Sequence, residues 1–96
     1  MRIPETIKIG PFTYKVLRPV VVNNNLRQRI GEADHENLVI KVEDGLAPEV
    51  AAEVFFHEVM HAVDVLMGTK LKETQVERMS KGLYMVLKDN SLLRDG

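Results

Sequence analysis

Two histidines and a glutamate stand close together in the stretch HEVMH, residues 57–61. Side chains four residues apart on a helix are neighbours, so His57 and His61 would direct two imidazoles at one point. Two nitrogens at about 2.0 to 2.1 Å from a common centre suit Zn²⁺. Glu58, rotated by about 100°, borders that point, where a general base would take a proton from a metal-activated water. This HExxH spacing predicts a zinc site with Glu58 as the catalytic base.

The helix that carries this motif is predicted to span residues 48–67. Pro48 suits the first position of a helix, and Gly68 supplies a stop. The polar residues of the segment fall on one arc with His57 and the others are apolar, so the helix is expected to be buried round most of its circumference. Asp64 lies on the same arc. It either orients a ligand histidine or is a solvated residue at the helix end, and the sequence leaves both interpretations open.

A catalytic zinc site with two histidines needs a third protein ligand and an open position for water. The chain has no cysteine, and the remaining histidine, His35, lies in a predicted turn. A second helix is predicted from residue 73 to residue 90, and its Glu73 and Glu77 both border an apolar face. Each glutamate has an explanation without a metal: Glu73 would interact favourably with the helix dipole, and Glu77 would be a solvated charge on the helix surface. The residue pattern alone therefore leaves the choice of carboxylate open.

The first 45 residues are predicted to form a small sheet. Residues 7–17 alternate apolar and polar side chains on both sides of Gly10-Pro11, which is typical of two strands joined by a turn. Residues 29–33 and 38–42 are further strand candidates, separated by a turn at 34–37, and the three asparagines at 23–25 indicate a loop. The expected fold class is α+β: an antiparallel or mixed sheet of three to four strands followed by two helices, in one domain over residues 1–96.

The composition limits the classes of function. A net charge of −1 and a pI near 6.3 give no field that would recruit nucleic acid or an anionic membrane, so neither is expected as a partner. The absence of cysteine excludes disulfides and thiolate catalysis. No uncharged apolar stretch approaches the length of a membrane span, and charge and proline interrupt the N-terminal segment MRIPETIK. We therefore expect a soluble, cytoplasmic protein.

The HEVMH stretch is followed on the second predicted helix by ETQVERMS, residues 73–80. Together they resemble the gluzincin pattern of an HExxH motif and a glutamate helix, in particular that of minigluzincins and ImmA/IrrE-like metallopeptidases, including short phage and prophage proteins. The resemblance extends over residues 30–42, 56–64 and 82–90. It implies a minimal zincin-like fold in which Glu73 is the third zinc ligand and Glu77 steadies a ligand histidine. Glu77 departs from the pattern, which more often has Asp or Asn, so exchanged roles of the two glutamates stay open.

The resemblance implies a zinc metalloendopeptidase that hydrolyses peptide bonds in a peptide or protein substrate, which would bind by strand addition at the sheet edge. The developing oxyanion needs a donor besides the metal, and the sequence offers Tyr84, on the stripe of Glu73, and His35. The alternative function is a zinc-stabilised binding or regulatory module, phage-related and with little general peptidase activity, because the further subdomain that forms the other cleft wall in larger gluzincins is not expected here. A third hypothesis makes one regulatory protein, such as a repressor, the only substrate.

Overall fold

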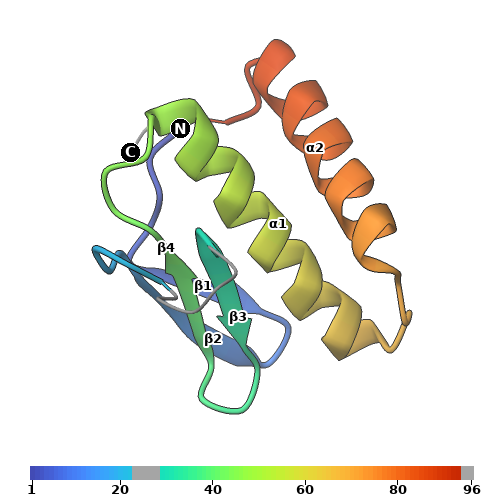
Figure 1. Cartoon of the computed structure of the whole chain (residues 1–96). Helices are drawn as coiled ribbons and strands as arrows, with labels where there is room; N and C mark the ends of the chain where they lie inside the picture. The colour runs from blue at the N-terminus through green and yellow to red at the C-terminus, as the bar shows by residue number, and fades with distance from the viewer. Residues whose placement is uncertain (23–28, 94–96) are drawn as a thin grey trace.

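The computed structural model of the chain describes residues 1–22 and 29–93 (Figure 1). Four strands, β1 (Thr6–Ile9), β2 (Phe12–Leu17), β3 (Gly31–Asp34) and β4 (Val39–Val42), precede two helices, α1 (Pro48–Met67) and α2 (Glu73–Asp89). The predicted α+β order of a sheet and then two helices is confirmed, and α1 has the bounds predicted from the sequence. The asparagine loop predicted at residues 23–25 lies outside the described residues.

The four strands form one mixed sheet in the order β1-β2-β4-β3. β1 and β2 form an antiparallel hairpin whose turn contains Gly10 at φ 60°, a conformation that glycine adopts without steric cost. β2 and β4 run parallel, whereas β3 pairs antiparallel with β4 and forms an edge of the sheet. In the turn between β3 and β4, Oδ1 of Asp34 accepts the backbone N–H groups of Glu36 and Asn37 at 3.1 and 3.0 Å. The side chain of Asp34 thus fixes the chain that follows the edge strand.

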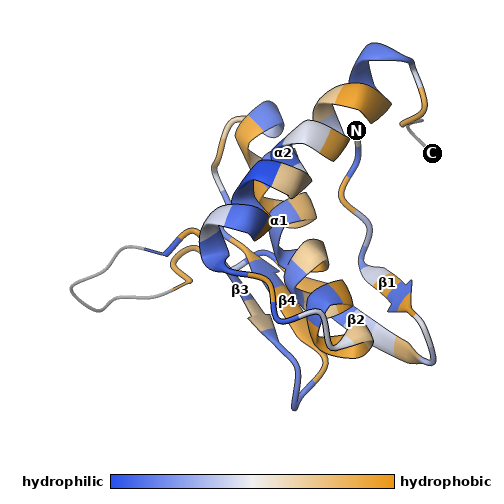
Figure 2. Cartoon of the chain, turned by 90° about the vertical axis from the view of Figure 1, so that its right-hand side faces the viewer, coloured by the Kyte–Doolittle hydropathy of each residue, from blue (hydrophilic) through white to orange (hydrophobic). Residues whose placement is uncertain are grey.

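α1 is the middle layer of the molecule, between the sheet and α2 (Figure 1). Its buried Ala51, Phe55 and Ala62 pack on the sheet, whose buried core residues are Ile9, Tyr14, Val16, Ile40 and Val42. The outer helix α2 is amphipathic, and hydrophilic and hydrophobic residues alternate along it (Figure 2). It packs mainly on α1, and its buried residues are Val76, Ser80 and Tyr84.

α1 is less buried than its sequence predicts. Val50, Val65 and Met67 are exposed, as are Val63 and Leu66. The sheet covers one side of the helix and α2 another, so that the strips between these two sides stay open to solvent. One of these strips carries the candidate metal centre described below.

Polar contacts tie α1 to α2 at one end of the helix pair and to the connecting loop at the other. At one end, Nζ of Lys88 lies 2.6 Å from Oε2 of Glu49. At the other end, α1 stops at Gly68, whose backbone has the left-handed φ of 65° and whose N–H donates to the carbonyl oxygen of Asp64. Oδ1 of Asp64 then accepts the backbone N–H of Leu71 at 2.9 Å and the hydroxyl of Thr69. Asp64 therefore shapes the loop that turns the chain back along α1.

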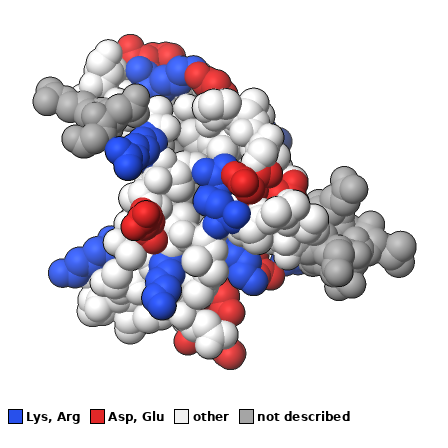
Figure 3. Space-filling model, turned by 90° about the vertical axis from the view of Figure 1, so that its left-hand side faces the viewer, with Lys and Arg blue, Asp and Glu red and all other residues white. Residues whose placement is uncertain are grey.

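Within residues 1–22 and 29–93, no helix is both long and apolar enough to cross a membrane. On the face of the molecule shown in Figure 3, basic and acidic side chains are interspersed among neutral ones. The expectations about nucleic acid, membranes and the cellular compartment stay predictions.

Candidate metal centre

His57 and His61 lie one helical turn apart on α1, and both side chains are half-buried. Their ring centroids are 4.8 Å apart with an interplanar angle of 69°, and their Nε2 atoms are 3.1 Å apart. Burial lowers the pKa of His61, although the charge of Glu73 opposes this effect. A lowered pKa favours the neutral imidazole, which is the form that binds a metal ion.

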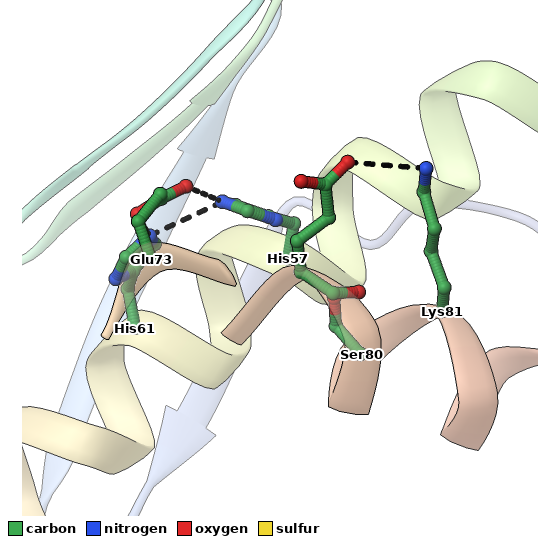
Figure 4. A network of polar contacts seen from close by, with 6 residues as sticks. His57, His61, Glu73, Ser80 and Lys81 are labelled. Atoms are coloured by element: carbon green, nitrogen blue, oxygen red, sulfur yellow. Dashed lines mark hydrogen bonds and ion pairs between the residues drawn. The ribbon is translucent and has the colours of Figure 1, made fainter. Parts of the chain in front are cut away.

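Glu73, the first residue of α2, reaches both histidines from the other helix (Figure 4). Its Oε1 lies 2.7 Å from Nε2 of His57, and its Oε2 lies 2.9 Å from Nε2 of His61. The loop fixed by Asp64 places the start of α2 here, and the backbone N–H of Lys72 donates to Oε1 of Gln75 at 2.8 Å, which holds the first turn of α2. The carboxylate that opens α2 therefore lies against both imidazoles.

The three side chains suit a divalent cation. One ligand atom from each of His57, His61 and Glu73 lies within 4.8 Å of the other two. Tetrahedral bonds of about 2.0 to 2.1 Å to zinc would put ligand atoms about 3.3 Å apart, so the separations of 2.7 to 3.1 Å found here need only a small expansion. Two nitrogens and a carboxylate are also a ligand set that zinc prefers. These residues fit Zn²⁺.

Glu58 lies beside this group but is not part of it. It is 8% exposed, on the side of α1 that faces β3. Burial, and then the negative charge of Glu73, raises the pKa of Glu58 to about 7. The close approach of β3 depends on Gly31, because a Cβ there would lie 2.8 Å from Oε2 of Glu58. The carboxyl is therefore held in a confined position, with an affinity for protons that suits proton transfer near neutral pH.

Two adjoining cavities, of about 390 and 460 Å³, meet at these residues. Gly31, His57, Glu58 and Glu73 line both of them. The first cavity extends between α1 and α2 toward Ser80 and Lys81, and the second extends along β3 toward His35. The candidate site therefore lies at the centre of a continuous cleft between the sheet edge and α2.

Two of the acids singled out in the sequence have other contacts. Glu77 is exposed, and its Oε1 lies 3.1 Å from Nζ of Lys81 in an ion pair within α2. Asp64 is hydrogen-bonded to the loop at Thr69 and Leu71, and within the described part of the chain none of its hydrogen bonds goes to a histidine. Asp64 therefore positions Glu73 through the loop instead of orienting a ligand histidine directly.

The structure does not bring Tyr84, which the sequence offered as an oxyanion donor, to the candidate site. Tyr84 is 5% exposed, its ring packs on that of Phe56 with centroids 5.4 Å apart, and its hydroxyl interacts with Glu49 near the start of α1. It lines neither of the two cavities. Eleven residues separate it from Glu73, which is about 16 Å along a helix. Glu73 and Tyr84 lie on the same side of α2, but Tyr84 lies far along the helix from the candidate site.

The structure adds one residue to the site and strengthens another. Gly31 was not among the residues predicted for the site, although a glycine within a strand pattern is itself a signal of close approach. His35, which the sequence placed in a turn and offered as a possible oxyanion donor, borders the same cavity as His57, Glu58 and His61.

No protein-family model, curated protein or solved structure matches this chain. The geometry of the site therefore carries the functional argument.

Proposed function

We propose that this chain is a zinc-dependent metallopeptidase with a minimal zincin-like fold, related to the gluzincins and of the minigluzincin or ImmA/IrrE-like kind. His57, His61 and Glu73 hold the ion in this proposal. The observation that supports it best is the approach of these three side chains from two helices to within 3.1 Å or less of one another, beside a buried carboxyl.

When bound, Zn²⁺ would supply a Lewis acid that polarises the peptide carbonyl and acidifies water. The residues of the chain perform the proton transfers. Glu58 accepts a proton from the attacking water while the water oxygen bonds to the carbonyl carbon, and it then donates that proton to the leaving nitrogen as the C–N bond breaks. A pKa near neutrality lets one carboxyl act in turn as base and as acid, and the positive charge of the ion would favour its charged form.

The cleft suits an extended peptide. β3 is an edge strand, so its outer backbone groups are available for pairing, and it borders the cavity that contains Glu58 and His61. A peptide paired with β3 would run past the candidate ligands with its backbone held by the strand. Such binding reads the backbone more than the side chains, so we expect broad sequence tolerance.

The ligand assignment is tested by measuring zinc stoichiometry and affinity in the wild type, Glu73→Ala and Glu77→Ala. Glu73→Ala should weaken zinc binding by at least a hundredfold, since it removes one of three ligands. Glu77→Ala is the matched control: it removes a carboxylate one turn further along α2 that is paired with Lys81, and it should retain zinc. Equal zinc affinity of the two variants would refute the assignment.

The catalytic assignment is tested by hydrolysis of unfolded protein substrates by the zinc-loaded wild type and Glu58→Gln. The variant should retain zinc and lose at least a hundredfold in kcat, because the base and acid are removed while the ligands stay. A wild type that binds one zinc but is as inert as the variant toward a broad panel, including candidate partner proteins, would refute the peptidase. That result would favour a zinc-stabilised binding module instead.

A further inference from the structure

His35 lies just after β3, where the edge strand turns toward β4. The turn is fixed by the hydrogen bonds of the Asp34 carboxylate to the following backbone N–H groups. His35 borders the cavity that is also lined by His57, Glu58 and His61. His35 is not one of the three residues that gather at the candidate metal centre. His35 therefore places an additional imidazole at the wall of the cleft, and this imidazole has no role among the proposed ligands or as the proposed base.

Tyr14 holds this ring from the core. The parallel pairing of β2 and β4 places Tyr14 beside the start of β4, since the next residue, Lys15, pairs with Val39. Tyr14 is 4% exposed, its ring meets that of His35 edge to face at a centroid distance of 6.4 Å, and its hydroxyl oxygen lies 3.3 Å from Nδ1 of His35. A buried tyrosine thus fixes both the position of the imidazole and the partner of one of its nitrogens.

The direction of this hydrogen bond determines which nitrogen of the neutral His35 ring carries the hydrogen. Burial, and then the charge of Asp34, raises the pKa of Tyr14, so its hydroxyl keeps its proton and can donate it to Nδ1. A neutral imidazole that accepts at Nδ1 carries its hydrogen on Nε2. Within residues 1–22 and 29–93, Nε2 of His35 has no hydrogen-bond partner. In this tautomer the ring keeps an Nε2–H donor that no described residue engages, and His35 itself lines the cleft.

We propose that Nε2–H of His35 donates a hydrogen bond to the carbonyl oxygen of the scissile peptide as that oxygen gains negative charge, and that Tyr14 is the positioning residue that sets the tautomer. The inference rests on the proposed peptidase function. His35 keeps its proton throughout, so the proton transfers remain with Glu58. The sequence offered this role to both Tyr84 and His35, and Tyr84 lies in the core.

Kinetics of zinc-loaded variants test the proposal. His35→Phe keeps a ring of similar size without a donor, and it should lower kcat on the order of a hundredfold with little change in KM, the cost of removing an oxyanion donor. His35→Gln, whose amide N–H reaches a similar position, should recover most of that loss. Tyr14→Phe should lower kcat about fivefold, because the ring stays but its tautomer is no longer fixed. Zinc affinity should be unchanged in all three variants, and Glu36→Gln, in the same turn, should behave as the wild type.

NMR of the imidazole nitrogens provides a readout that does not depend on activity. In the wild type near neutral pH, His35 should be the Nε2–H tautomer, and Tyr14→Phe should populate both tautomers. A wild type in the Nδ1–H tautomer overturns the role of Tyr14. Peptide hydrolysis by the wild type together with full activity of His35→Phe overturns the role of His35 and leaves the peptidase standing, whereas a wild type inert toward every peptide overturns both.

Discussion

Replacing Gly31 by alanine tests whether the close approach of β3 to α1 defines the site. The backbone of Gly31 has an ordinary negative φ, so alanine meets no torsional strain there, and its effect depends on the space for the added methyl group. That methyl would lie 2.5 Å from Cγ1 of Val54 and 2.8 Å from Oε2 of Glu58. Ordinary contact begins at 3.4 Å, so the first distance is 0.9 Å short and the second 0.6 Å short.

The two neighbours will respond differently. The carboxyl of Glu58 is the end of a flexible side chain and can rotate away, whereas the β-branched Val54 has one preferred rotamer on a helix. Relief at Val54 therefore requires β3 or α1 to shift. Insertion of one methyl group into a packed site of this kind costs about 1 to 3 kcal/mol, which lowers the melting temperature by about 5 to 20 °C in a domain of this length.

Thermal unfolding of Gly31→Ala and Gly82→Ala, with both proteins metal-free, measures this cost. A Cβ at Gly82 meets no atom within 4 Å, and Gly82 lies inside α2, so its replacement should stabilise the protein by about 0.5 to 1 kcal/mol. The same chemical change is thus expected to act in opposite directions at the two positions. On the proposed peptidase function, Gly31→Ala should also lower the kcat of the zinc-loaded protein, because the carboxyl of Glu58 moves, while zinc affinity stays near that of the wild type. If Gly31→Ala is as stable as the wild type, the contact between β3 and α1 is looser than described here.

Three further predictions concern other parts of the fold. The pKa of Glu58 is raised to about 7 from 4.5, so the contribution of its carboxyl to the stability of the metal-free protein is fully present below pH 4.5. About 3 kcal/mol of that contribution is lost as the pH rises from there through 7. Urea unfolding at several pH values should show this loss in the wild type and not in Glu58→Gln, and parallel profiles would contradict it. Hydrogen bonds from Leu71 and Thr69 lower the pKa of Asp64 from 3.8, so its contribution to stability is present above pH 3.8 and is lost as the pH falls below it. Asp64→Asn should reduce this loss of stability at low pH, and an unchanged loss would refute the role of the carboxylate. Val76→Ala should cost about 2 kcal/mol in urea unfolding because Val76 is fully buried between the helices, and a cost near zero would show that α2 packs loosely.

The helices could be predicted from local signals. Pro48 and Gly68 delimit α1 as expected, since a proline suits the first turn and the left-handed φ of 65° at Gly68 ends the helix. The placement of His57 and His61 on one face follows from helix geometry alone. The choice of Glu73 over Glu77 as the residue beside the histidines could not be made in this way, because it depends on the length and shape of the loop after Gly68.

Other features depend on contacts distant in sequence. The parallel pairing of β2 with β4 leaves β3 at the sheet edge, and nothing in the local pattern of these strands specifies that order. The contact of Tyr14 with His35, 21 residues later, follows from this pairing. The position of Tyr84 outside the cleft could not be predicted for a related reason: a helical wheel shows which side of α2 it occupies but not how far along the helix the cleft extends.

The placement of Glu73 on α2 ties the candidate metal centre to the outermost layer of the protein. Because α2 packs mainly on α1, it can detach in a local opening while α1 and the sheet stay folded. Each such event would carry Glu73 away from the histidine pair, so the affinity for a cation includes the free energy of reattaching the helix. By thermodynamic reciprocity, a bound cation would suppress the opening by the same amount, and slower amide hydrogen exchange along α2 would report occupancy of the site.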